Sequence, residues 1–238
     1  MSEIKLILGD CLEKMKDIPN SSIDLVITSP PYYEKNIRGH NKKSSPLYMN
    51  FFIPFIKYKT EWFKEIYRII KEKGMVFMNL GFNADTGWKL PFELIANNPF
   101  NTRDLIIWHK RNPEPNSMGG LTHSYEFIFI FHKTTKPNYT IKKNEYIQDV
   151  WDMKVEQNYS CTKSSEFYHG AMFPLSLPKK ILQIASNKGD TILDCFMGSG
   201  TTGIACKELG RNFIGIEINP KYIEIAQRRI NQTIESFL

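Results

Sequence analysis

The sequence lacks any long hydrophobic run. Its longest purely apolar stretches are the size of a β-strand, as in FIFIF at residues 127–131, whereas a membrane-spanning helix needs roughly 20 consecutive apolar residues. The start, MSEIKLILGD, also lacks the basic head, apolar stretch and small-residue cleavage site of a secretory signal. We therefore expect a cytoplasmic protein with no membrane partner.

Cysteine is scarce, and its spacing excludes two kinds of site. Cys11, Cys161, Cys195 and Cys206 are far apart and form no CxxC pair, which argues against a thiolate zinc site and against a redox motif. No other metal-ligand spacing is evident, so no metal is expected. The chain has no internal repeat, and its 238 residues fit one domain under the rule of roughly 150 residues per domain.

Positive charge exceeds negative charge. The formal net charge is +6 and the pI is near 9.0, which suits a polyanionic partner without identifying one. Residues 34–59 and 133–168 mix Lys and Arg with Tyr, Phe and Trp, a combination that can follow a phosphate backbone and stack on bases. We interpret both stretches as insertions that recognise nucleic acid; the alternative is solvated loops anchored by aromatic residues. The basic candidates in the first stretch are Lys35, Arg38, His40, Lys42 and Lys43.

The pattern of apolar residues predicts an α/β protein. Short, β-rich apolar runs alternate with segments of helical period, which is typical of a largely parallel sheet covered by helices on both faces. The seven predicted strands are residues 4–8, 23–28, 74–80, 104–110, 126–132, 191–196 and 212–218.

Two helices are predicted from apolar stripes and end signals. Residues 60–74 form a stripe that Gly74 can terminate. Near the end of the chain, Asn219 can cap a helix whose first residue is Pro220. The stripe of the first helix contains Trp62, Phe63, Ile66, Ile69 and Ile70, and that of the second contains Ile223, Ala226, Ile230 and Ile234.

A glycine-rich turn, DCFMGSGTT at residues 194–202, joins a predicted strand to a helix. Gly198 and Gly200 permit a tight turn and a close approach by a ligand. Glu217 ends the next predicted strand, where its carboxylate can accept hydrogen bonds from two ribose hydroxyls. The glycines follow FxGxG rather than a phosphate-loop or GxGxxG spacing, so a nucleoside cofactor with a sulfonium centre fits better than NAD. Asp194 either faces that cation or merely caps the helix.

A second motif, TSPPYY at residues 28–33, directly follows the apolar run IDLVI. Because proline fixes φ and has no N–H, Ser29 and the two prolines can present a stiff array of acceptors. An exocyclic base amine needs such acceptors, since its lone pair is delocalised into the ring. Tyr32 can stack on a base extruded from the duplex. The alternative is a simple strand-terminating turn.

Together these motifs resemble those of the S-adenosylmethionine-dependent DNA amino-methyltransferases. TSPPYY matches their (Asp, Asn or Ser)-Pro-Pro-(Tyr, Phe or Trp) motif, and DCFMGSGTT matches DPFxGSGTT, with Cys195 where proline is common. Residues 169–182 are similar to the segment that covers the methionine end of the cofactor. The catalytic motif comes first, as in the permuted beta group of this family. The resemblance spans most of the chain and implies a single catalytic domain over residues 1–238, with a Rossmann-like, seven-stranded methyltransferase sheet.

The resemblance also implies a cofactor, S-adenosylmethionine, and a set of site residues. Among these, Asp10 would lie near the adenine of the cofactor, although an ordinary turn aspartate is the alternative. The implied catalytic residues are Ser29, Pro30, Pro31 and Tyr32, and the implied cofactor-binding residues are Asp10, Cys11, Phe173, Asp194, Phe196, Gly198, Gly200, Thr201, Thr202 and Glu217.

Serine at position 29 favours N4 of cytosine as the methylated atom, and N6 of adenine is the alternative. Methylation of RNA or of a protein amide, and a catalytically silent DNA-binding subunit, are alternatives of other classes. The implied partners are double-stranded DNA and a cognate restriction endonuclease, with the chain acting as a monomer or homodimer. His109, Lys110 and His123 lie at the edges of predicted strands and receive no catalytic role, and His169 is interpreted as a helix cap.

Overall fold

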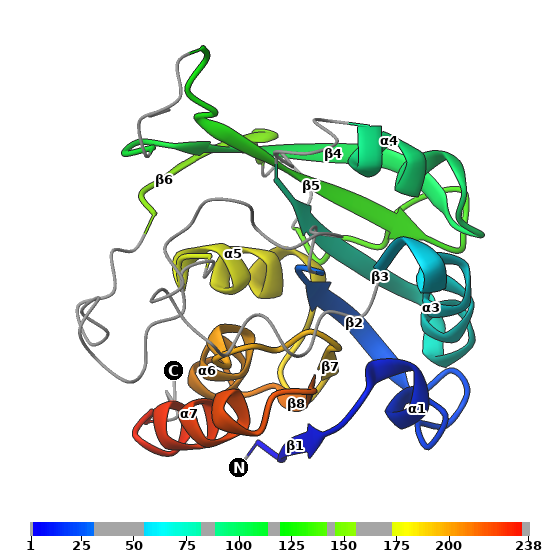
Figure 1. Cartoon of the computed structure of the whole chain (residues 1–238), viewed down its shortest axis with the longest axis vertical. Coiled ribbons are helices and arrows are strands. Elements are labelled where there is room, and N and C mark those ends of the chain that lie inside the picture. The colour runs from blue at the N-terminus through cyan, green and yellow to red at the C-terminus, as the bar shows by residue number, and fades with distance from the viewer. Residues whose placement is uncertain are drawn as a thin grey trace.

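The structure, a computed structural model, describes residues 2–30, 55–81, 89–113, 120–141, 146–155 and 173–234 (Figure 1). These residues form a mixed sheet with helices on both faces, as the sequence predicts. None of the described helices combines the length and the apolar character that a membrane crossing requires.

One eight-stranded sheet runs through the molecule in the order β1-β8-β7-β2-β3-β5-β4-β6. β5 is antiparallel to its neighbours β3 and β4, and the other neighbouring pairs are parallel. The strands are β1 (Ile4–Leu8), β2 (Ile23–Thr28), β3 (Ile70–Leu80), β4 (Asn101–Lys110), β5 (Tyr125–His132), β6 (Val150–Met153), β7 (Thr191–Asp194) and β8 (Asn212–Glu217).

Helices cover both faces of this sheet and enclose two apolar cores (Figure 1). One core packs beneath α5, α6 and α7 and the other beneath α1 and α3, with α4 on the same side. The helices are α1 (Cys11–Met15), α3 (Phe55–Ile69), α4 (Lys89–Ala96), α5 (Ser176–Ala185), α6 (Thr201–Glu208) and α7 (Pro220–Asn231).

The predicted boundary between the first helix and the third strand is wrong. α3 ends at Ile69, and Ile70 already pairs with Ile23 of β2. The run from Ile70 to Gly74 is therefore strand, because pairing with β2 outweighs the helical stripe. The predicted cap of α7 is confirmed: the Asn219 side chain accepts a hydrogen bond from the backbone N–H of Lys221, and Pro220 follows it.

The predicted count of seven strands is also wrong, because β6 adds an eighth at the edge beside β4. β6 comes from residues 133–168, one of the two stretches interpreted as insertions. In the same stretch Tyr139 and Ile141 pack against the core under α5. Of the other interpreted insertion, residues 55–59 belong to α3, and residues 34–54 lie outside the described residues.

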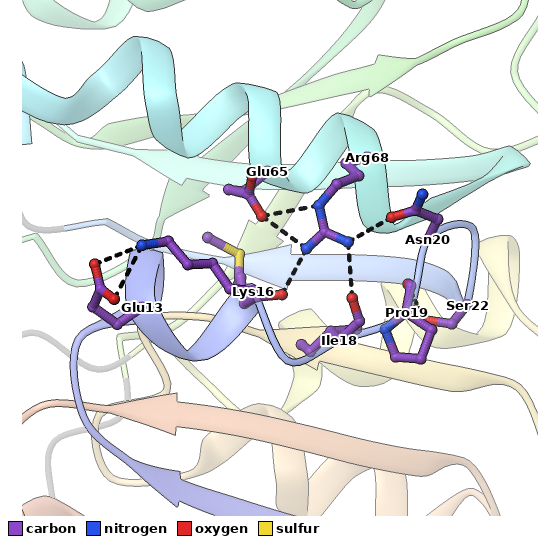
Figure 2. Close-up of polar contacts among 9 residues, drawn as sticks. Glu13, Lys16, Ile18, Pro19, Asn20, Ser22, Glu65 and Arg68 are labelled. Carbon is purple, nitrogen blue, oxygen red and sulfur yellow. Dashed lines mark hydrogen bonds and ion pairs between the residues drawn. The ribbon is translucent and has the colours of Figure 1, made fainter.

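Arg68, near the end of α3, holds the connection between α1 and β2 (Figure 2). Its guanidinium donates to the backbone oxygens of Met15 and Ile18 at 2.8 and 2.9 Å and to the Asn20 side chain at 2.6 Å. The carboxylate of Glu65 accepts two further hydrogen bonds from it. Arg68 therefore supplies donors to backbone carbonyls that follow a short helix and precede β2.

Strand order brings distant parts of the chain together. β7 and β8 come late in the sequence but lie between β1 and β2. Because these four strands are parallel, their carboxyl ends meet at one edge of the sheet, which is where open α/β sheets bind ligands. Both predicted motifs begin at that edge.

Candidate active site

A direct hydrogen bond joins the two motifs. Thr28, the last residue of β2, donates through Oγ1 to Oδ1 of Asp194, the last residue of β7, at 2.9 Å. Both side chains are buried, with 1% and 2% of their surface exposed. The half-buried Ser29 and the buried Pro30 follow Thr28 directly. The proline corner and the glycine loop therefore start from the same point of the sheet.

Asp194 accepts hydrogen bonds from three separate elements of the chain. Besides the bond from Thr28, Oδ1 accepts from the backbone N–H of Phe196 at 3.2 Å, and Oδ2 accepts from Oγ1 of Thr202 at 2.7 Å. Burial raises the pKa of Asp194 to about 6, while the hydrogen bonds from Thr202, Thr28 and Phe196 oppose that rise. The carboxylate thus ties β2, the glycine loop and α6 together.

Cys195, where related motifs carry proline, contributes contacts of its own. The indole N–H of Trp62 on α3 donates to its Sγ at 3.3 Å, and Oγ1 of Thr28 lies 3.7 Å from the same sulfur. Burial raises the pKa of the Cys195 thiol to about 12, so it stays protonated. The ring of Trp62 also packs against Phe196, with centroids 5.5 Å apart. These contacts connect α3 to the glycine loop.

The glycine loop adopts a backbone that favours glycine. Gly200 precedes α6 with φ of +82°, and an added Cβ would lie 2.8 Å from Cβ of Ala226. From α7, Arg229 donates to the backbone oxygen of Ser199 at 2.7 Å and to its Oγ at 2.8 Å. The loop is therefore held from α7 as well as from β7.

Glu217 closes the loop on the side of β8. Its Oε2 accepts from the backbone N–H of Gly198 at 2.8 Å, and its Oε1 accepts from that of Asn219 at 2.9 Å. Burial raises the pKa of Glu217, and these two backbone hydrogen bonds oppose the rise. A carboxylate offers about four acceptor positions, so each oxygen keeps capacity for a ribose hydroxyl.

These residues fit a nucleoside better than a nucleotide. Phosphate-binding loops point free backbone N–H groups at the anion, but the N–H of Gly198 donates to Glu217. The neighbouring Asp10 lies just after β1 and caps α1, accepting from the backbone N–H of Leu12 at 2.8 Å. A buried or half-buried acid at each strand end suits an uncharged or cationic ligand.

The structure brings many of the predicted site residues to this edge. Cys11 is buried at the start of α1, where burial raises the pKa of its thiol. Thr201 and Thr202 are buried in the first turn of α6. Phe173 packs against the core beneath α5. Predicted residues outside the described part of the chain are Pro31, Tyr32, Lys35, Arg38, His40, Lys42, Lys43 and His169.

Sequence reasoning missed three residues that hold this site. Thr28 had a signal, because it is the polar residue that ends an apolar strand directly before the Pro-Pro corner. Trp62 and Arg229 had none, since each is an ordinary member of a helix whose partner is distant in the sequence. Among the residues that the structure describes, no group of three or more His, Cys, Asp or Glu could hold a metal ion.

Two residues without a predicted role lie farther along the same edge. Nδ1 of His109 lies 2.5 Å from Oδ1 of Asp152 at the exposed surface of β4 and β6. Lys110 pairs with Glu126 of β5. Neither pair belongs to the cluster around Asp194.

Comparison with known proteins identifies the family. A family model described as DNA methylase matches residues 23–228. The Type II methyltransferase M.HinfI of Haemophilus influenzae is 31% identical over 247 residues, covering 95% of this chain and 68% of that protein.

Solved structures share the fold. PvuII DNA methyltransferase, described as cytosine-N4-specific, superposes with a TM-score of 0.74 at 19% identity, covering 96% of this chain and 86% of that one. The structure of an M1.HpyAVI–SAM complex has a TM-score of 0.67 at 27% identity, covering 96% of this chain and 99% of that one. The predicted Rossmann-like methyltransferase fold is confirmed, and the chain belongs to the DNA methylase family.

Proposed function

We propose that this chain is a site-specific DNA methyltransferase that moves a methyl group from S-adenosylmethionine to the exocyclic N4 amine of a flipped cytosine. The observation that carries the proposal is the 2.9 Å hydrogen bond between Thr28 and Asp194. It sets the proline corner and the glycine loop side by side, as a transfer between two bound molecules requires.

Bound S-adenosylmethionine would supply an electrophilic methyl group on a sulfonium. The carboxylate of Glu217 would accept hydrogen bonds from the ribose hydroxyls, and Asp10 would lie near the adenine. The glycine loop and Phe173 would contact the methionine end, with Asp194 keeping the loop in register with β2. The solved complex of M1.HpyAVI with SAM supports this choice of cofactor.

The chain would prepare the amine through acceptors at the corner. The Ser29 hydroxyl oxygen and the Pro30 carbonyl would accept hydrogen bonds from the amine and draw its nitrogen toward tetrahedral geometry. Ser29 is a poor base, so the proton would leave to water after methylation has made the amine acidic. Positioning and acceptor electrostatics would supply most of the rate enhancement. Tyr32 would stack on the flipped base.

Serine at position 29 is the reason for choosing cytosine. The description of PvuII methyltransferase as cytosine-N4-specific agrees with that choice, although 19% identity makes it a likeness of fold alone. The Type II name of M.HinfI supports a restriction-modification role with a cognate endonuclease. Basic and aromatic residues of 34–59 and 133–168 would contact the duplex, including Lys35, Arg38, His40, Lys42 and Lys43. Tyr139 and Trp151 of the second stretch belong to the core instead.

The test is mass spectrometry of nucleosides from DNA incubated with the chain and labelled S-adenosylmethionine. N4-methyldeoxycytidine is the expected product. N6-methyldeoxyadenosine as sole product would refute the cytosine assignment but keep the DNA amino-methyltransferase. Label in tRNA or protein but not in duplex DNA would refute both. Sequencing of methylated sites from cells that express the chain would then give the recognition sequence.

A further inference from the structure

A second polar network occupies the carboxyl edge of the sheet beyond the proline corner. Lys110 of β4 lies 2.5 Å from Glu126 of β5, measured from Nζ to Oε1. The amide of Asn79 on β3 donates to the other oxygen of Glu126 at 2.6 Å. The Lys110 and Glu126 side chains are 20% and 16% exposed, and Asn79 is 4% exposed.

Strand register places this network next to Ser29. Thr28 pairs with Met78 in the parallel β2–β3 ladder, so one further residue brings Ser29 level with Asn79. Neighbouring strands are about 4.8 Å apart, and side chains two residues apart share a face. Ile27 and Phe77 lie in one core, so Ser29 and Asn79 continue that face.

Glu126 and Lys110 project on that same face. Two residues after Glu126, Ile128 lies in the same core, and two residues before Lys110, so does Trp108. The network therefore extends from the proline corner across β3, β5 and β4, toward the end of the sheet that β6 completes.

The position of the Lys110–Glu126 pair suits a fixed hydrogen-bond donor better than an ion pair that stabilises the fold. Taking two charges largely out of water costs free energy that can exceed the gain from their attraction, so a buried ion pair is weak evidence of a stabilising role. Gly81 closes over the carboxylate, since a Cβ there would lie 3.1 Å from Cδ of Glu126. Glu126 is thereby held in place, and the Lys110 ammonium, with three donors, has donors beyond the one that faces Glu126.

The ring edge of cytosine matches such a donor. Next to its N4 amine, cytosine presents two acceptors in sequence, N3 and O2, whereas adenine presents N1 and then a C–H group. With the amine at Ser29 and Pro30, these acceptors would point along the network. We propose that Lys110 donates a hydrogen bond to the ring-edge acceptors of the target base, and that Glu126 and Asn79 are positioning residues for its ammonium. This assignment rests on the proposed function and adds a specificity determinant to it.

The test compares Lys110→Met with Lys71→Met on two duplexes. Lys71 also pairs with an acid, Asp24, at 2.7 Å, but β3 carries it at the opposite edge. One duplex contains the recognition site found by methylation sequencing, and the other is identical except that the target nucleotide is abasic. Binding of each duplex and of S-adenosylmethionine is measured for each protein, with thermal unfolding as the check on folding.

Lys110→Met should weaken binding of the intact duplex roughly 10-fold or more and bind the abasic duplex as the unmodified chain does. Its affinity for S-adenosylmethionine should stay within about twofold of that of the unmodified chain, because the proposed contact is to the base and not to the cofactor. Lys71→Met should change neither duplex. If Lys110→Met unfolds, the double variant Lys110→Met/Glu126→Gln removes the unpaired carboxylate and should give the same pattern.

Equal weakening of both duplexes, with a smaller salt dependence of binding, would make Lys110 a phosphate contact and overturn the proposal. No weakening of either duplex would also overturn it. Failure of the proposed function is visible separately, because it appears as the wrong methylated nucleoside from the unmodified chain.

Discussion

The two ends of β2 and β7 differ in how their acidic residues are held. At the carboxyl ends, Asp194 accepts from the hydroxyls of Thr28 and Thr202, and Glu217 of the neighbouring β8 accepts from the backbone N–H of Gly198. At the amino edge, Asp24 pairs with the half-exposed Lys71 and accepts from the backbone N–H of Thr191. β2 and β7 are thus joined by a buried hydrogen bond at their carboxyl ends and by an acid with a partly exposed lysine partner at their amino ends.

A hollow at the amino edge does not change this contrast. Its volume is about 470 Å³, and its lining includes Asp24, Lys71 and Asp190. Three of the charged residues that line it are already partnered, since Lys71 pairs with Asp24 and Asp190 accepts from the backbone N–H of Asn187 at 2.7 Å. The volume of a hollow alone therefore does not identify the active site of this molecule.

The largest expected effect comes from removing the acid that joins the two motifs. Asp194→Ala leaves the hydroxyls of Thr28 and Thr202 without their acceptor in a buried site. It should lower the free energy of unfolding by roughly 1–3 kcal/mol and methyl transfer by about 100-fold or more. Denaturant unfolding and a labelled methyl-transfer assay measure the two losses.

Asp24→Ala is the matched change at the amino edge. Because Asp24 is more exposed and its partner Lys71 can turn to solvent, methyl transfer should stay within about twofold. Equal loss of methyl transfer in both variants would show that the carboxyl edge has no special role.

The raised pKa of the buried Asp194 should also make the free energy of unfolding depend on pH. Between its ordinary value of 3.8 and about 6, the folded chain keeps a proton that the unfolded chain has lost. The free energy of unfolding should therefore fall as pH rises through that window, by up to roughly 3 kcal/mol. Above pH 6 this contribution should be constant.

Asp194→Asn is the control for the pH effect, because the amide does not titrate. Glu217 titrates in both proteins, so it cancels from the difference between their unfolding free energies. That difference should change between pH 4 and 6 and be flat above. A difference that is flat from pH 4 to 8 would contradict the burial of a titrating Asp194.

Substitution of Arg68 tests whether the amino edge contributes to stability but not to turnover. Arg68→Met removes the donors that satisfy the carbonyls of Met15 and Ile18 (Figure 2). It should lower the free energy of unfolding by roughly 2 kcal/mol while the folded protein keeps its turnover. Lys16→Met removes the exposed pair with Glu13 and should leave stability within measurement error. A turnover loss in Arg68→Met well below its unfolding transition would contradict this division.

The two motifs can be recognised from the sequence because proline restricts the backbone at the first turn and glycine permits the backbone that the second turn needs. It does not predict the Thr28–Asp194 hydrogen bond, which joins residues 166 positions apart, although family motif order implies that they meet. β6 was missed because it has only four residues, VWDM, within a stretch dominated by basic and aromatic side chains. The end of α3 was misplaced because Ile70 continues the helical stripe, and only its partner Ile23 makes it strand.

The smallest expected effect comes from alanine substitutions at two glycines, which distinguish backbone strain from a steric contact at the cofactor loop. Gly200 and Gly189 have nearly equal φ values, +82° and +84°, but lie near opposite edges of the sheet. An alanine at either position carries the left-handed penalty of about 1–2 kcal/mol. At Gly189 an added Cβ meets nothing within 4 Å, whereas at Gly200 it would press on Ala226.

Gly200→Ala should therefore cost more stability than Gly189→Ala and should also weaken S-adenosylmethionine binding, because α7 must move away from the loop that Arg229 holds. Gly189→Ala should show the strain alone, with cofactor affinity unchanged. Calorimetric titration of both variants with S-adenosylmethionine, beside thermal unfolding, measures the two effects separately. Equal cofactor affinity in the two variants would mean that the close packing of Gly200 on α7 serves the fold rather than the ligand.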